Sequence, residues 1–199
     1  MKAYPAHAIM IAMKTLAIIL AGGQGLRLGG IDKGLLPYAG STLIETILAV
    51  ISPQVDQTVI SCNRNLEQYQ QFGYPIITDT LSGYQGPLAG IAAALSGKQQ
   101  CDVAITLPCD SPNPPEDLAL KLGSQLADDN YDLCYAWDGN RDQYLFSAMH
   151  YRCRAQLEDY LARGGRSVKG FHQRLRCKRV DFSSQPQRFI NINAPADLP

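Results

Sequence analysis

The sequence predicts an α/β fold in which helices cover both faces of a mostly parallel sheet that contains one antiparallel strand. Apolar runs of strand length alternate with helical segments along the chain, as they do in parallel sheets with helical crossovers. The first run, residues 15–19, is almost wholly apolar, which is typical of a strand buried on both faces. A turn signal at Asp138-Gly139-Asn140 predicts a hairpin, and therefore the antiparallel strand.

Local signals predict the individual elements in order. The expected strands cover residues 15–19, 57–62, 75–78, 102–107, 131–137, 143–150, 177–182 and 189–195, with a short extended piece at 34–38. The expected helices cover residues 42–53, 66–72, a segment opening at 86–90, 114–128, 154–162 and 167–173. Thr42 and Glu45 form a capping box, Asn65 can cap the second helix, and Pro87 suits a first helical turn.

Composition narrows the class of protein. The chain has 199 residues, enough for one domain with a sizeable core, and its formal net charge is zero. This balance argues against nucleic-acid or membrane-surface binding, and no apolar run approaches the roughly 18 residues that span a bilayer. The six cysteines show no Cys-x-x-Cys pair and no zinc spacing. We therefore expect reduced thiols in a cytoplasmic protein.

Residues 1–14 are expected to be an extension, followed by a single domain over residues 15–199. The apolar part of the extension is short and is interrupted by His7 and Lys14, unlike a signal peptide. The simpler hypothesis is that translation starts at Met10 or Met13. N-terminal sequencing of the native protein would test it.

The glycine-rich stretch of residues 20–33 dominates the functional interpretation. Backbone N–H groups in such a loop, at the carboxyl end of a buried strand, can cradle phosphate, and Arg27 and Lys33 add two cations. A P-loop would need Ser or Thr after Lys33, and a dinucleotide fingerprint would need a small residue in place of Leu28. The pattern Leu-Ala-Gly-Gly-x-x-x-Arg-Leu-Gly-x-x-x-Lys instead resembles the signature loop of nucleoside-triphosphate nucleotidyltransferases. The alternative is a glycine-rich turn that holds no ligand.

Further candidates follow other predicted strands, where ligands of such sheets bind. Asp110 follows the fourth strand and suits Mg²⁺, or it caps the next helix. Asp79 follows the third strand and could contact a base or ribose, bind metal through water, or form an Asx turn. Residues 86–90 offer a helix amino terminus that a ring or phosphate can approach closely.

Two segments near the carboxyl end complete the candidates. Asn191 and Asn193 would share one face of the last expected strand and could hold a metal, a phosphate or a base edge, unless they only serve the turn before Pro195. Between residues 150 and 180 the chain has nine Lys and Arg. They form either a solvated helix face or a local field for an anionic substrate.

These motifs, with Asp32-Lys33-Gly34, Asn63-Arg64, Gly-Pro-Leu-Ala-Gly, Pro-Cys-Asp and Asn-Ile-Asn-Ala-Pro, together strongly resemble the molybdenum cofactor guanylyltransferases from about Thr15 to Leu198. The resemblance implies the three-layer, Rossmann-like nucleotide-diphospho-sugar transferase fold. It implies transfer of GMP from GTP to molybdopterin carrying molybdenum, with Mg²⁺ as cofactor and pyrophosphate as the second product. Molybdopterin-delivering proteins and acceptor molybdoenzymes are the further partners it implies.

The resemblance, together with positions at strand ends, assigns residues to roles. The expected catalytic residues are Arg27, Lys33 and Asp110, the last as the metal ligand. The expected nucleotide-binding residues are Leu20, Ala21, Gly22, Gly23, Lys33, Ser61, Asn63, Asp79, Gly86, Pro87, Leu88 and Asp110. The expected pterin or phosphate contacts are Asn191, Asn193, Arg152 and Arg166. Two departures stand out: Ser61 where the family can use Asn, and Asp142-Gln143-Tyr144 where His-Pro is usual.

The implied mechanism depends on charge. The terminal phosphate of molybdopterin attacks the α-phosphorus of GTP and is already anionic, so no general base is needed. Positioning and charge neutralisation must then supply the catalysis. The alternatives are the same chemistry with CTP, a sugar-1-phosphate nucleotidyltransferase, an NADP-binding reductase in which Arg64 contacts the 2′-phosphate, and a non-catalytic nucleotide-binding adaptor.

Overall fold

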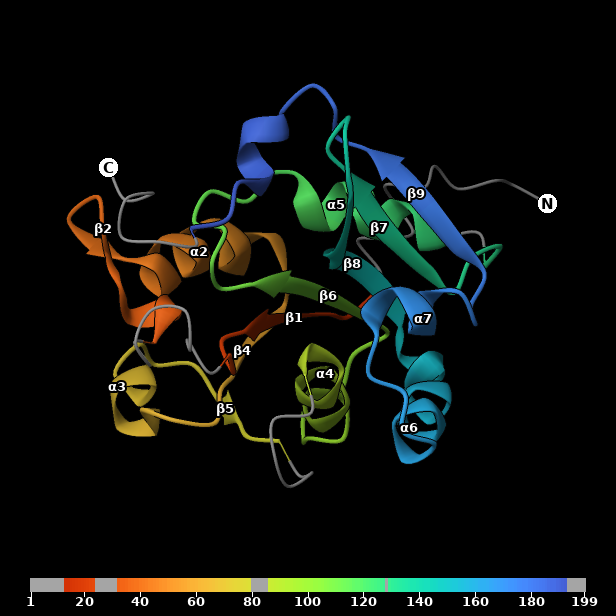
Figure 1. The fold of residues 1–199 in the computed structure, drawn as a ribbon, viewed down its shortest axis with the longest axis horizontal. Helices are drawn as coiled ribbons and strands as arrows, with labels where there is room; N and C mark the ends of the chain where they lie inside the picture. Colours follow the sequence, from red (N-terminus) through yellow and green to blue (C-terminus); the bar gives the residue numbers. More distant parts are fainter. Residues whose placement is uncertain (1–12, 24–31, 80–85, 128, 193–199) are drawn as a thin grey trace.

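The computed structural model describes residues 13–23, 32–79, 86–127 and 129–192 (Figure 1). Within them, seven strands form one sheet in the order β5-β4-β1-β6-β8-β7-β9. The strands are β1 (Thr15–Leu20), β4 (Gln57–Ser61), β5 (Ile76–Ile77), β6 (Val103–Pro108), β7 (Leu133–Trp137), β8 (Asp142–His150) and β9 (Cys177–Asp181). Every pairing is parallel except those of β8 with β6 and β7. The predicted fold class is confirmed.

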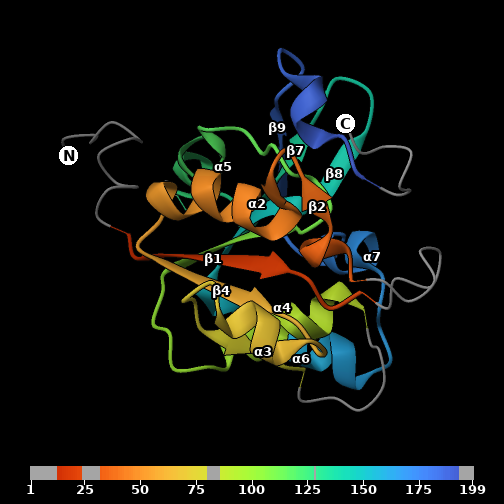
Figure 2. The same cartoon turned by 90° about the vertical axis from the view of Figure 1, so that its left-hand side faces the viewer.

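Helices cover the two faces of the sheet in separate layers (Figure 2). Alternate residues of β1 contribute to different cores, because side chains along a strand alternate between its faces. Ala17 and Ile19 pack in the core that contains α2 (Leu43–Ile51) and α5 (Leu118–Gly123). Leu16 and Ile18 pack in the core of α4 (Pro87–Leu95) and α6 (Arg154–Ala162), which explains why the whole run is apolar.

Short elements complete the described chain. They are α3 (Leu66–Gln70), α7 (Val168–His172), the hairpin β2 (Pro37–Tyr38) and β3 (Ser41–Thr42), and the 3₁₀ turns η2 (Lys33–Leu35), η3 (Ser52–Gln54), η4 (Ser124–Leu126), η5 (Tyr151–Cys153) and η6 (Pro186–Phe189). Both hydrogen bonds of the predicted capping box between Thr42 and Glu45 are present. None of the helices in the described part has the length and hydrophobicity that crossing a bilayer requires.

Four sequence predictions about elements were wrong, and the first is the extended piece expected at 34–38, because residues 34–35 belong to the 3₁₀ turn η2. The helix expected over 114–128 begins only at Leu118, and Pro114 precedes a second proline, a position that disfavours the helical conformation. Asn65 precedes α3 but does not cap it, since its side chain donates to Asp32. The strand expected over 189–195 is absent: η6 ends at Phe189 and residues 190–192 have no regular structure. Residues 193–195 lie outside the described residues.

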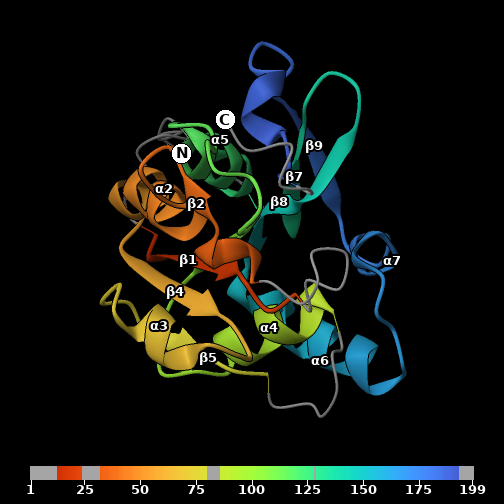
Figure 3. The same cartoon turned by 60° about the vertical axis from the view of Figure 1, so that its left-hand side comes forward.

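The topology brings several segments to one edge of the sheet. Strands β1, β4, β5 and β6 are parallel, so their carboxyl ends lie on the same side, where the arrowheads of β1 and β4 point in Figure 3. Because β8 runs in the opposite direction, its first residues reach that edge as well. Ligands of open α/β sheets bind at this edge.

Candidate active site

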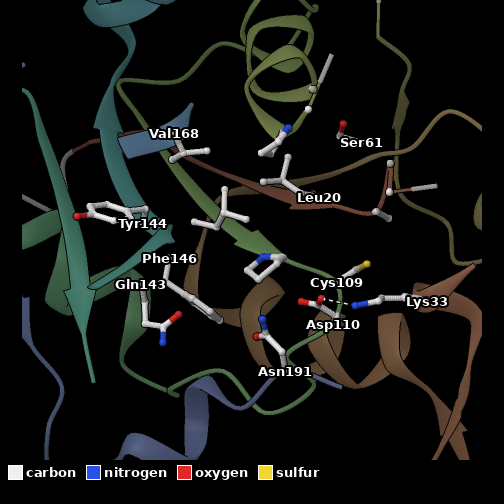
Figure 4. A pocket seen from close by; sticks show the side chains of 18 of the residues that line it. Leu20, Lys33, Ser61, Cys109, Asp110, Gln143, Tyr144, Phe146, Val168 and Asn191 are labelled. Carbon is white, nitrogen blue, oxygen red and sulfur yellow. Dashed lines mark hydrogen bonds and ion pairs between the residues drawn. The ribbon is translucent and has the colours of Figure 1, made fainter. Parts of the chain in front are cut away.

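A cavity of about 710 Å³ opens at the carboxyl edge of the sheet (Figure 4). Its lining comes from the ends of β1, β4 and β6, the start of α4, the first half of β8 and residue 191. Most of the predicted site residues line it, namely Leu20, Ala21, Gly22, Gly23, Lys33, Ser61, Asp79, Gly86, Pro87, Asp110 and Asn191. Arg27 and Asn193 lie outside the described residues.

Lys33 and Asp110 meet in this cavity from distant parts of the chain. The ammonium Nζ of Lys33, in η2, lies 2.9 Å from Oδ2 of Asp110, just after β6. The two side chains are only 23% and 18% exposed, so water screens the pair less than it would screen an ion pair on the surface. Lys33, the last residue of the glycine-rich stretch, and the acid at 110 therefore line one cavity.

The second carboxylate oxygen of Asp110 is suited to a metal ion. Oδ1 is buried and has no hydrogen-bond partner within the described residues. Those residues contain no group of three or more His, Cys, Asp or Glu side chains that could hold a metal. A divalent cation here would therefore take one protein carboxylate and complete its shell with substrate phosphate and water, which is how Mg²⁺ often binds.

Asp79 is held by Asn63 through two reciprocal hydrogen bonds. The Asn63 amide nitrogen donates to Oδ2 of Asp79 over 2.9 Å, and the backbone nitrogen of Asp79 donates to Oδ1 of Asn63 over 2.8 Å. Asp79 lines the cavity, whereas Asn63 does not. Asn63 therefore supports Asp79, and its own predicted nucleotide contact stays a prediction.

The start of α4 approaches β4 very closely. A Cβ added at Gly90 would lie 2.2 Å from Oγ of Ser61, so a larger residue here would displace that hydroxyl. Ser61, Gly86 and Pro87 line the cavity beside the positive end of the helix dipole. Leu88 does not line it, because its side chain is buried in the core beneath α4, and its predicted nucleotide contact stays a prediction.

The opposite wall is aromatic and comes from β8 and α7. Gln143, Tyr144 and Val168 line it, and the Tyr144 ring packs against Tyr135 and His172 at centroid distances of 5.0 and 5.4 Å. Burial and a nearby carboxylate raise the pKa of Tyr144 to about 12, and burial lowers the pKa of His172 to about 4. This wall is therefore uncharged at neutral pH.

Sequence reasoning assigned no role to this wall. The segment 142–144 stood out only as a departure from a resembling family. The predicted antiparallel hairpin was the available signal, because reversing β8 brings its first residues to the ligand-binding edge.

Asn191 reaches the cavity from an irregular segment that is attached next to Asp110. The hydroxyl of Ser111 donates to Oδ1 of Asn191, and the backbone nitrogen of Ile192 donates to the carbonyl of Asp110 over 2.7 Å. Since Ser111 uses the amide oxygen, we expect a ligand to meet the amide nitrogen.

The predicted substrate contacts of the basic run are not supported by the positions of Arg152 and Arg166. Arg152 pairs with Asp129 and Asp132, and Nη1 of Arg166 donates to the carbonyls of Leu161 and Gly165. Neither arginine lines the cavity. Further pairs in this run are Arg154–Glu158, Arg163–Asp159 and Arg176–Asp132. These pairs are consistent with the alternative interpretation, a solvated helix face, and the local field for an anionic substrate stays a prediction.

Comparisons with known proteins agree with this geometry. Residues 17–177 match the family described as the MobA-like NTP transferase domain. The molybdenum cofactor guanylyltransferase of Mannheimia succiniciproducens is 44% identical over 182 residues, covering 92% of this chain and 95% of that protein. The Pasteurella multocida protein of the same name is 41% identical over 182 residues, covering 92% and 96%.

Solved structures show the same fold. Molybdopterin-guanine dinucleotide biosynthesis protein A from Archaeoglobus fulgidus has a TM-score of 0.74 at 25% identity, covering 92% of this chain and 94% of that one. The 4-diphosphocytidyl-2C-methyl-D-erythritol synthase of Anaerococcus prevotii has a TM-score of 0.72 at 16% identity, covering 96% and 95%, and shows the fold alone.

Proposed function

Because the chain belongs to the MobA-like NTP transferase family, we propose that it is a molybdenum cofactor guanylyltransferase. It transfers GMP from GTP to molybdopterin carrying molybdenum and releases pyrophosphate. This proposal rests on the Lys33–Asp110 ion pair, which lines a single cavity whose two ends are formed by different elements of the fold. The cavity volume of about 710 Å³ lies within the range of roughly 300–1,000 Å³ typical of small-molecule sites.

The nucleotide binds at the end formed by β1, β4 and α4. Backbone groups of Leu20, Ala21, Gly22 and Gly23 are within its reach, and Ser61 lies beside the helix amino terminus. The carboxylate of Asp79, fixed by Asn63, accepts a hydrogen bond from the base or from a ribose hydroxyl. Molybdopterin binds at the other end, against Tyr144, Gln143 and Asn191.

Catalysis follows from positioning and charge. The attacking phosphate of molybdopterin is already anionic, so the chain needs no general base and must instead reduce repulsion between two anions. Lys33, together with Arg27, takes up charge on the triphosphate. We expect the Lys33 ammonium to exchange Oδ2 of Asp110 for a phosphate oxygen when GTP binds, since both are anionic partners within its reach.

Asp110 would hold Mg²⁺ through its buried Oδ1. When bound there, Mg²⁺ neutralises charge on the phosphates and on the departing pyrophosphate. Asn191 lies on the molybdopterin side of Asp110, and we expect its amide nitrogen to hold the attacking phosphate.

We place the enzyme in the cytoplasm as one domain over residues 15–199, with proteins that deliver molybdopterin or accept the finished cofactor as further partners. None of the six cysteines, all of which lie in the described part of the chain, forms a disulfide, which supports a reducing compartment. Burial raises the pKa of Cys62 to about 12 and also raises that of Cys109, so these two thiols beside the site are unreactive at neutral pH.

Nucleotide selectivity tests the proposal. GTP, CTP and ATP are compared by calorimetry and by radiolabelled transfer to molybdopterin, each with and without Mg²⁺. We expect a preference for GTP and a requirement for Mg²⁺ that is lost together with activity in Asp110→Asn. A preference for CTP would make the protein a cytidylyltransferase, and absence of transfer with all three nucleotides would reject the proposal.

A further inference from the structure

The buried carboxylate of Asp32 accepts hydrogen bonds from three donors. The Tyr69 hydroxyl donates to Oδ1 over 2.6 Å, the Asn65 amide to Oδ2 over 3.0 Å, and the Gly34 backbone nitrogen to Oδ1 over 3.2 Å. Arg64 Nε lies 3.7 Å from Oδ2. Asp32 is only 6% exposed, and a desolvated carboxylate needs such compensation.

Asp32 directly precedes Lys33 and caps the turn η2 that carries it. The bond from the Gly34 nitrogen to Asp32 closes this turn at its start, and the Leu36 nitrogen donates to the Lys33 carbonyl at its end. A Cβ on Gly34 would lie 2.4 Å from the Tyr69 hydroxyl, so glycine is needed for Tyr69 to reach Asp32. The backbone that aims the Lys33 side chain is therefore fixed through Asp32.

The groups that hold Asp32 come from a loop that also holds Asp79. This loop, residues 63–65, follows β4. Asn63 bonds Asp79, while Arg64 and Asn65 contact Asp32. Asn65 has a φ of 52°, a left-handed conformation that asparagine tolerates better than most residues. One short loop thus connects the Asp79 side of the cavity to the Lys33 side.

We propose that Asp32 is a positioning residue, which sets where the Lys33 ammonium lies relative to Asp110. Through the loop 63–65 it also fixes the position of this ammonium relative to Asp79. It touches no substrate and acts through Lys33. The consequence for turnover rests on the proposed function, whereas the effect on Lys33 itself does not. Burial raises the pKa of the Tyr69 phenol, so Tyr69 remains protonated and donates to Asp32.

The first test measures the reactivity of Lys33 without any nucleotide. Competitive labelling with an amine reagent and mass spectrometry compares Lys33 with exposed Lys98 in wild type, Asp32→Asn and Tyr69→Phe. We expect Lys33 labelling to change by about 2- to 10-fold in both variants, the factor that corresponds to one hydrogen bond of ordinary net strength. Lys98 labelling should stay constant. Asp110→Asn is the reference variant, because it shows how strongly Lys33 is labelled when its ion pair with Asp110 is absent.

A matched control separates positioning from general destabilisation. Ile47 is buried in the same core as Tyr69 and takes no part in the hydrogen bonds of Asp32. Ile47→Val should lower thermal stability and leave Lys33 labelling unchanged. If Asp32→Asn does not fold, Tyr69→Phe decides the question. Unchanged Lys33 labelling in the folded variants would overturn the proposal.

The second test measures guanylyl transfer. We expect Asp32→Asn to lower kcat by about 10- to 100-fold, as a displacement of about 1 Å from the reacting geometry can do, with a smaller change in KM for GTP. Ile47→Val should keep the wild-type kcat. Wild-type kcat in Asp32→Asn would contradict the proposal. If the wild type itself transfers no guanylyl group, the proposed function fails, while the labelling result still decides whether Asp32 positions Lys33.

Discussion

One end of the cavity is built from parallel strands and the start of α4, and its polar groups are held by close neighbours. Asn63 fixes Asp79 there, and Gly90 lets Ser61 reach the helix. At the other end, Tyr144 comes from the reversed strand β8 and Asn191 from an irregular segment much later in the chain. The first end presents a carboxylate and a helix dipole, whereas the second presents aromatic rings and amides.

This difference indicates how the fold divides recognition between two substrates. The first end suits a nucleotide, which needs groups fixed for a base, a ribose and phosphates. The second end suits a flat heterocycle, because Tyr144 offers a ring and Gln143 and Asn191 offer neutral hydrogen-bonding groups. Asp110 lines the same cavity as both ends, so variants can affect both ends or only one.

The largest effect is expected from Asp110→Asn, which should impair the function of both ends of the cavity at once. The loss of a charge that holds metal and substrate phosphates removes several kcal/mol of transition-state stabilisation, or about 10³-fold in kcat. Radiolabelled turnover at saturating substrates measures it. Asp159→Asn, in an exposed ion pair with Arg163 outside the cavity, is the control and should keep full activity. Turnover by Asp110→Asn within tenfold of wild type would contradict the assignment.

His172 makes the aromatic end sensitive to acid. Burial holds its pKa in the folded protein at about 4, below the ordinary histidine value of about 6.5, so the unfolded state takes up the proton first as pH falls. The contribution of the neutral His172 to the free energy of unfolding is therefore complete above about pH 6.5. This contribution, at most about 3 kcal/mol, is lost as pH drops toward 4. Urea unfolding at pH 7 and pH 4 should show a smaller loss in His172→Phe than in wild type. An equal loss of unfolding free energy in wild type and His172→Phe would refute this.

Gly90→Ala should impair the nucleotide end of the cavity alone. The new methyl group would clash with Ser61 Oγ and displace this hydroxyl, which lines the nucleotide end, and we expect GTP binding to weaken about tenfold, within the usual cost of overpacking. Calorimetry with GTP measures the change. Adding Ser61→Ala removes the atom that clashes and should restore part of the affinity. If the double variant binds GTP no better than Gly90→Ala, the clash is not the cause.

Tyr144→Ala should affect the aromatic end alone and has the smallest expected effect. The loss of one aromatic contact should raise KM for molybdopterin by about 2- to 10-fold, while the Kd for GTP stays the same. Tyr74→Ala, which lies outside the cavity lining, is the matched control. A weaker GTP affinity in Tyr144→Ala would mean that the two ends are not separate.

The features around the nucleotide end that could be predicted from the sequence are determined by residues that are close together in the chain. The apolar run of β1, the glycines after it, the capping box at Thr42 and the proline that opens α4 each depend on neighbouring residues in the chain. The edge at which Asp79 and Asp110 lie follows from strand direction alone. Local signals did not show that Asn63 turns toward Asp79 or that Leu88 turns into the core, because those directions depend on packing.

The aromatic end could not be predicted in the same way. Its residues come together only because β8 is reversed and α7 packs beside it. The alternation of Asn191 and Ile192 resembles a strand, yet bonds to Ser111 and Asp110 hold this segment away from any sheet. Likewise, the many arginines of the 150–180 run suggested an anion field, and only the positions of Asp129 and Asp132 show that Arg152 is already paired.

The bond between Ile192 and Asp110 has a consequence for how the enzyme is made. The last strand of the sheet ends at Asp181, about ten residues before the segment that secures the region around Asp110. A nascent chain on the ribosome can therefore complete its sheet before its active site is finished. A chain shortened by proteolysis after Phe189 would keep every strand of the described residues and lose both tethers at Asp110 and Ser111.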